Sequence, residues 1–135
     1  MRVDGTWRRY RKVAPIRAIR ATAPGRIDTL EGPVPYRVGD YLCVGSMGER
    51  WPQSGSHFEG PGAIFELVAG PDAEGYFLYR KTLAVEAQRQ PRAFSTPLRD
   101  GTVLAGKMGD WLVREGTSTW VVDADIFART YEEIR

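Results

Sequence analysis

The chain has 135 residues, 42% of them hydrophobic, and a formal net charge of +2. This length is typical of one domain, and the apolar content is enough to close a core without disulfides or metals. Cys43 is the single cysteine, so the sequence offers neither an internal disulfide nor the paired Cys/His spacing of a structural zinc site, and we predict no metal and no cofactor.

The first half of the chain predicts a short series of strands. Residues 13–19 are rich in apolar side chains, and Pro15 favours a position at a sheet edge. A loop rich in Gly and Pro follows, and Gly39-Asp40 then opens a strand over residues 41–44, in which alternate side chains face opposite sides of the sheet. Two glycines next supply the turn of a hairpin that returns through Trp51.

The middle of the chain predicts a second hairpin. The Gly60-Pro61-Gly62 triplet cannot continue a helix, so a short turn is expected just before it. Residues 63–69 have the composition of a strand, and residues 70–75 form a turn that leads into the apolar run 76–79.

The second half predicts the same order of elements and then a helix. A strand at residues 83–87 precedes Gly109-Asp110, which opens a further hairpin. Asp123 can accept hydrogen bonds from the free N–H groups that begin a helix, and apolar side chains then recur along one face. We therefore expect a helix of about ten residues over positions 124–133, with Phe127 and Tyr131 buried.

The two halves also match residue by residue. Tyr10-Arg11-Lys12 matches Tyr79-Arg80-Lys81 at an offset of 69, and Trp51 matches Trp120 at the same offset. The Gly-Asp pairs match at an offset of 70. We infer a single domain, 1–135, containing an internal repeat, 10–62 and 79–135, joined by a hairpin at 63–78. The predicted fold class is α+β, mostly antiparallel β, with two pseudo-twofold-related meander units and a C-terminal helix.

Several of these motifs resemble those of a family of small phage-borne and bacterial proteins without an assigned activity. The family pattern runs roughly Tyr-Arg-Lys-Lys-Pro, Glu-Ala, Pro-Gly-Asp-Tyr, Gly-Glu-x-Tyr-Pro and Asp-Ile-Phe-x-x-Thr-Tyr-Glu. The likeness covers residues 79–133 well and residues 10–59 more loosely, but Val38 and Met108 replace the proline before Gly-Asp, and Trp120-Val121 departs from the Tyr-Pro element. The resemblance implies a setting in phage or mobile-element biology and transfers no catalytic residue.

Positive charge is concentrated at the start of the chain. Residues 1–26 carry eight cations against Asp4 alone, a net charge of +7, which leaves −5 for the rest. Such asymmetry is typical of a segment that meets phosphate, although the same cations could pair with acidic residues elsewhere in the fold. The candidate ligand-binding residues are the two matched triplets, in which cations adjoin a ring that could stack on a base: Tyr10, Arg11, Lys12, Tyr79, Arg80 and Lys81. Matched aromatic residues are also typical of a core.

Catalysis has few candidate residues in this sequence. His57 is the only histidine and lies near Ser54 and Ser56 in the chain, but it is also typical of a packed or surface residue. Asp40 and Asp110 could act as a carboxylate pair, yet Asp after Gly is ordinary turn chemistry. We therefore predict a non-enzymatic binding module for an anionic ligand, either a nucleotide or nucleic acid, or for a protein partner. The alternatives are a small enzyme and a structural or interaction component.

The expected location is the cytoplasm. A lone cysteine suits a reducing compartment. No stretch of the sequence has the length and apolar character of a signal peptide or a membrane span, so no membrane partner is predicted.

Overall fold

The computed structural model describes residues 6–98 and 100–135 and divides the chain into two compact units. Unit 1 combines the N-terminal residues through Lys12 with Ala84–Arg135, and unit 2 is Val13–Leu83. Each unit contains a five-stranded antiparallel sheet and a separate two-stranded hairpin. The predicted strand-rich, antiparallel fold with a C-terminal helix is confirmed. The twofold relation between the units stays a prediction.

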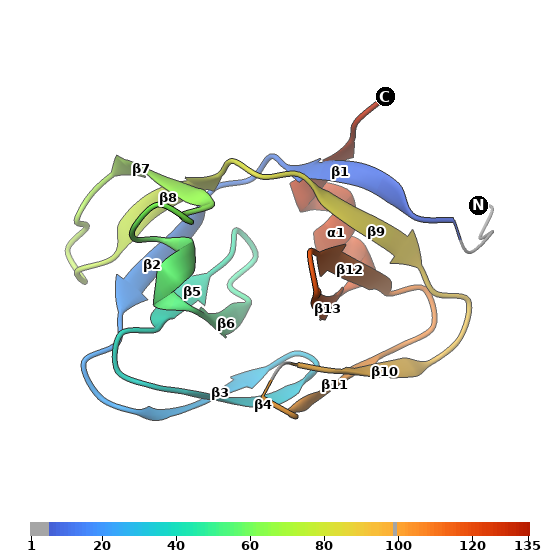
Figure 1. Ribbon diagram of the computed structural model, residues 1–135, viewed down its shortest axis with the longest axis horizontal. Coiled ribbons are helices and arrows are strands. Elements are labelled where there is room, and N and C mark those ends of the chain that lie inside the picture. The colour runs from blue at the N-terminus through green and yellow to red at the C-terminus, as the bar shows by residue number, and fades with distance from the viewer. Residues whose placement is uncertain (1–5, 99) are drawn as a thin grey trace. The chain divides into compact units, whose positions relative to one another are not determined.

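Unit 2 has the strand order β6-β5-β2-β8-β7 (Figure 1). Its sheet strands are β2 (Ile16–Arg20), β5 (Tyr41–Val44), β6 (Arg50–Gln53), β7 (Phe65–Ala69) and β8 (Phe77–Lys81). The separate hairpin is β3 (Gly25–Thr29) and β4 (Gly32–Tyr36), and a 3₁₀ turn, η1 (Gly55–His57), follows β6. The β7–β8 pair is the hairpin expected in the middle of the chain.

Unit 1 has the corresponding order β13-β12-β9-β1-β14. Its sheet strands are β1 (Arg8–Lys12), β9 (Val85–Arg89), β12 (Trp111–Glu115), β13 (Ser118–Val122) and β14 (Tyr131–Glu133). The separate hairpin is β10 (Phe94–Pro97) and β11 (Val103–Gly106). Helix α1 (Ala124–Thr130) lies between β13 and β14 in the chain and is the one α-helix among the described residues.

The first strand of each half pairs with the other half of the sequence. In unit 1, Tyr10 of β1 is opposite Val85 of β9, and in unit 2, Tyr79 of β8 is opposite Ile16 of β2. These two registers correspond at the offset of 69 found in the sequence. Each sheet is thus completed by a strand that the sequence assigns to the other repeat, so the compact units do not coincide with the predicted repeats.

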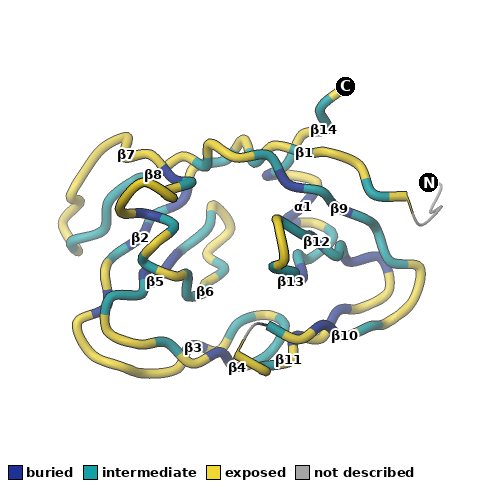
Figure 2. Tube along the Cα trace, in the orientation of Figure 1, coloured by how far each residue is buried: buried dark blue, intermediate teal, exposed yellow. Residues whose placement is uncertain are grey.

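Stacked rings form the centre of each core. Along the backbone, Figure 2 shows buried residues on β2, β5, β9 and α1, among other elements. In unit 2, Phe58 is stacked between Tyr41, at 4.2 Å between ring centroids, and Phe65, at 4.6 Å. In unit 1, Phe127 is stacked between Trp111, at 4.0 Å, and Tyr131, at 4.6 Å. Aromatic pairs of this kind stabilise a core by about 0.5–1.5 kcal/mol beyond their burial.

Several predicted boundaries are wrong. The helix ends at Thr130 and not at residue 133, because Tyr131 is extended and opens β14, which pairs with β1. Phe127 is buried as predicted, whereas Tyr131 is only half-buried. The first strand of unit 2 begins at Ile16, and Pro15 does not place it at an edge, because a proline that precedes a strand removes no N–H from its ladder. The expected Gly/Pro loop after it contains the β3–β4 hairpin.

Candidate functional site

The two tyrosines of the matched triplets lie in the aromatic cores. Tyr10 makes edge-to-face contacts with Trp111, at 5.4 Å, and with Phe127, at 4.9 Å. Tyr79 contacts Tyr41 and Phe58 in the same manner in unit 2. Both rings therefore have a packing role that accounts for their presence without a ligand.

The lysines of the triplets lie over ring faces at the margins of these cores. The Lys12 ammonium is 5.7 Å from the centroid of the Tyr131 ring, and the Lys81 ammonium is 5.6 Å from that of Phe65. Such cation–π contacts stabilise exposed sites by about 0.5–1 kcal/mol. The two lysines thus stabilise the edge of each sheet.

The arginines of the triplets differ from one another. Arg80 of β8 donates to Glu66 of β7, its cross-strand neighbour, and forms an ion pair with it. Arg11 of β1 is opposite Glu132 of β14, but it is exposed and lies in no ion pair among the described residues. The triplets belong to different units, and a groove bordered by both stays a prediction.

Arg11 belongs to a row of side chains on the face of the unit 1 sheet that lies opposite its aromatic core. Because Tyr10 points into the core, Arg9 and Arg11 project from the opposite face of β1. Arg9 is opposite Glu86 of β9, and Glu86 is opposite Arg114 of β12. Arg114 donates from Nε to Glu86 Oε1 at 3.0 Å, and its guanidinium lies 4.0 Å from the centroid of the Trp7 ring.

We call this set of side chains, Trp7, Arg9, Arg11, Glu86 and Arg114, the arginine face. Arg9 is exposed, like Arg11, and no described carboxylate forms an ion pair with it. Sequence reasoning missed Trp7 and Arg9, although the period of two that links Trp7, Arg9 and Arg11 is a strand signal. The sequence carries no comparable signal for Arg114, because its proximity arises from the pairing of β12 with β9.

The basic residues of the second strand are paired. Arg17 donates to Asp72 Oδ2 at 3.0 Å and to Glu74 Oε1 at 3.1 Å, and its guanidinium lies 4.7 Å from the centroid of the Tyr76 ring. The hydrogen bond to Asp72 raises the pKa of Arg17. Arg17 therefore fits the second interpretation of the basic segment, in which its cations pair with acidic residues elsewhere in the fold.

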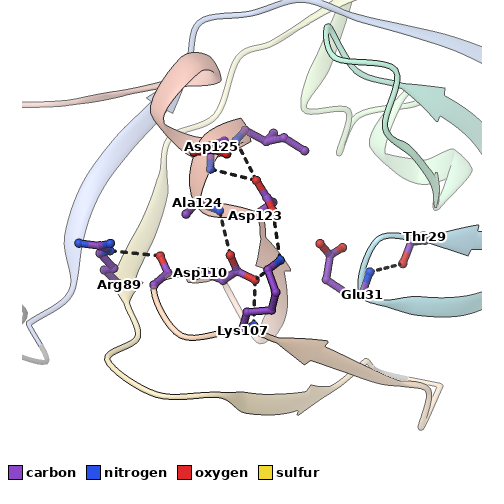
Figure 3. A network of polar contacts seen from close by, with 10 residues as sticks. Thr29, Glu31, Arg89, Lys107, Asp110, Asp123, Ala124 and Asp125 are labelled. Carbon is purple, nitrogen blue, oxygen red and sulfur yellow. Dashed lines mark hydrogen bonds and ion pairs between the residues drawn. The ribbon is translucent and has the colours of Figure 1, made fainter.

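The Gly-Asp motifs have structural roles. Asp110 is buried and accepts hydrogen bonds from the backbone N–H groups of Lys107 and Ala124, each at 2.9 Å (Figure 3). Gly109, with a φ of +92°, provides the turn before it, which a side chain at that position would strain. Asp40 is half-buried and accepts one such bond, from the N–H of Arg37. Because these bonds use the carboxylate oxygens, they favour a role in holding the turn over the catalytic alternative.

Asp110 also connects this turn to the start of helix α1. Lys107 Nζ lies 3.4 Å from Asp110 Oδ2 and 3.3 Å from Asp123 Oδ2, and the Asp123 carboxylate caps the helix through the N–H groups of Asp125 and Ile126 (Figure 3). The hydrogen bond to Asp123 and the charge of Asp110 raise the pKa of Lys107. Burial raises the pKa of Asp123, but the cap bonds and Lys107 outweigh it and hold that pKa below its ordinary value.

His57 belongs to a hydrogen-bonded chain of side chains in unit 2. Trp51 Nε1 donates to Gln53 Oε1 at 2.9 Å, and Gln53 Nε2 is 2.9 Å from His57 Nδ1. Because the indole nitrogen can only donate, it fixes the Gln53 amide with its NH₂ group toward the imidazole, so that Nδ1 accepts. The hydroxyls of Ser54 and Ser56 bond to each other at 2.9 Å. In these contacts neither serine hydroxyl bonds to the His57 imidazole, as a serine nucleophile would bond to its base.

One further ionisable cluster is formed by Tyr41, Tyr79 and Glu59 in unit 2. Burial, followed by the charges of Tyr79 and Glu59, raises the pKa of Tyr41 to about 12, and burial also raises the pKa of Tyr79. Tyr41 therefore stays protonated at neutral pH and is unsuited to act as a base there.

Three comparisons complete the description of the site. Protein-family models, curated proteins and solved structures yielded no match to the chain, so the family resemblance stays an expectation. Within residues 6–98 and 100–135, no group of three or more His, Cys, Asp or Glu side chains is arranged to hold a metal ion. The same residues include no helix with the length and apolar character needed to cross a bilayer.

Proposed function

We propose that this protein is a non-catalytic binding module that holds a chain of phosphates on the arginine face of unit 1. The observation that carries the proposal is that Arg9 and Arg11 project from the same side of β1, exposed and without a described ion-pair partner. The other arginines of the sheet strands near the start of the chain, such as Arg17 and Arg20, contact carboxylates.

The spacing of these two arginines favours a polyanion over a single phosphate. Alternate residues of a strand are about 6.6 Å apart along its axis, so their guanidinium groups can contact successive phosphates of an extended chain. Arg114 adds a third cation, whose charge is offset by its pairing with Glu86. The net positive charge of the face is therefore small, and binding should be modest and sensitive to salt.

A titration with a fluorescein-labelled single-stranded (dT)₂₀ oligonucleotide, followed by fluorescence anisotropy, tests the proposal. Exchanging both Arg9 and Arg11 for Gln should weaken binding at low salt by about tenfold or more. Because each phosphate contact on a single strand contributes about 0.7 to the slope of log K against log salt, the double variant should lose roughly 1.4 from that slope.

The matched control is Arg26→Gln combined with Arg37→Gln. These two arginines are also exposed and lie in no described ion pair, but they belong to unit 2. Both double variants lower the net charge by the same amount, so a purely nonspecific charge effect would weaken them equally. Equal weakening, or the absence of wild-type binding at low salt, would contradict the proposal and leave a protein partner as the better hypothesis.

A further inference from the structure

The Trp7 ring lies against a cation that is itself paired with a carboxylate. The Arg114 guanidinium that lies 4.0 Å from the ring centroid is itself held by the hydrogen bond from its Nε to Glu86 Oε1. Arg114 and Glu86 are cross-strand neighbours on β12 and β9, so the sheet sets their geometry. These contacts favour one orientation of the indole before any ligand binds, which lowers the entropic cost of stacking on it.

A second feature is the place of this ring beside Arg9 and Arg11, the two arginines of β1 that form no ion pair with a described residue. Trp7 precedes β1 directly, and its period of two with Arg9 and Arg11 places all three along one line of the arginine face. Trp7 is half-buried, and Arg114 is the one cation or ring that contacts it among the described residues. The part of the ring that remains exposed lies at the end of the row of cations.

We propose that Trp7 is a stacking platform for a base of single-stranded nucleic acid, whose phosphates extend along Arg9 and Arg11. This inference rests on the proposed function and adds to it the class of ligand. A base in a duplex is already stacked between its neighbours and cannot present its face to an indole, whereas a single-stranded base can do so. A polyanion without bases would gain nothing from Trp7.

Three labelled probes of equal length separate these ligands: (dT)₂₀, a 20-unit abasic deoxyribose-phosphate chain and a 20-base-pair duplex. Stacking of one base on an aromatic ring corresponds to roughly 5- to 150-fold in affinity, so the wild-type protein should bind (dT)₂₀ more tightly than the abasic chain by a factor in this range. Trp7→Ala should lower the affinity for (dT)₂₀ to that for the abasic chain and leave the abasic affinity unchanged.

Tyr76→Ala is the matched control, because Tyr76 also lies against an arginine, Arg17, but in unit 2. It should change neither affinity. If Trp7→Ala folds poorly, Trp7→Leu replaces it, because leucine keeps an apolar side chain without a ring. It should show the same loss of affinity for (dT)₂₀ and leave the affinity for the abasic chain unchanged.

Equal wild-type affinities for (dT)₂₀ and the abasic chain, tighter binding of the duplex, or equal weakening of both single-stranded probes by Trp7→Leu would overturn the inference. Each of these outcomes leaves phosphate binding intact, whereas failure of all three probes to bind at low salt contradicts the proposed function itself.

Discussion

Replacing Asp110 by Asn gives a direct measure of what this carboxylate contributes to the fold. Its Oδ1 accepts from the N–H of Ala124 and its Oδ2 from the N–H of Lys107, and the side chain is 3% exposed. An asparagine has one acceptor oxygen, so it can satisfy one of these N–H groups and must direct its own NH₂ toward the other.

The expected cost follows from that geometry. A buried N–H left without an acceptor costs about 1–3 kcal/mol, so Asp110→Asn should lower the free energy of unfolding by about 2 kcal/mol. Asp40 accepts a single N–H bond at the matched position, which asparagine can preserve, and Asp40→Asn should therefore change the free energy by less than about 0.5 kcal/mol. The loss of the Lys107 ion pair adds little, because the ammonium is 75% exposed.

Urea denaturation followed by tryptophan fluorescence and circular dichroism measures both variants against the wild-type chain. The comparison removes the effect of exchanging Asp for Asn as such, since both variants make the same change of atom and charge. Equal shifts of the two unfolding midpoints would refute the reasoning, because they would mean that the second N–H bond of Asp110 contributes nothing.

Three further predictions concern the cores and the helix. Phe127→Ala should cost about 3–5 kcal/mol, because the residue is 3% exposed and its ring is stacked against Trp111 and Tyr131, and an unchanged urea midpoint would exclude this packing. Asp123→Ala should cost about 1 kcal/mol near neutral pH. Because the pKa of Asp123 is lowered in the fold, its contribution should be present above its ordinary pKa of 3.8 and disappear as the pH falls through the lowered value, where wild type and variant should converge in acid denaturation. Because the pKa of Tyr41 is raised from 10.0 to about 12 in the fold, the protonated tyrosine contributes stability below about pH 10, and this contribution is lost as the pH approaches 12. Tyr41→Phe should therefore make the decline of stability at alkaline pH less steep. Absorbance at 295 nm should show that this tyrosine ionises late in the wild type.

Local features of the fold could be predicted from sequence because they depend on neighbouring residues. Alternation over residues 41–44 gave the correct faces, with Tyr41 and Cys43 buried. The helix begins at Ala124 because Asp123 supplies acceptors to its first N–H groups, and this capping pattern is visible in the sequence. The glycine of each Gly-Asp pair has a positive φ, and turn chemistry anticipates this conformation.

The candidate site could be predicted only in part. The basic segment and its tyrosines were visible in the sequence, but the two triplets of identical residues have unequal environments. Arg80 has Glu66 as an ion-pair partner, while Arg11 lies opposite Glu132 without forming one. An ion pair depends on side-chain conformation across strands that are distant in sequence, so matched motifs alone could not predict that Arg80 pairs with its cross-strand carboxylate and that Arg11 does not.

Tertiary structure alone decided which strands pair. The sequence allows each first strand to fold back on the second strand of its own half, since only residues 13–15 separate β1 from β2, but β1 pairs with β9 and β14 instead. The same pairing ends helix α1 at Thr130, because Tyr131 becomes extended to join β1. Helix propensity and turn chemistry act over a few residues, whereas strand pairing depends on hydrogen bonds and packing between segments about seventy or more positions apart, and these outweigh the local preference.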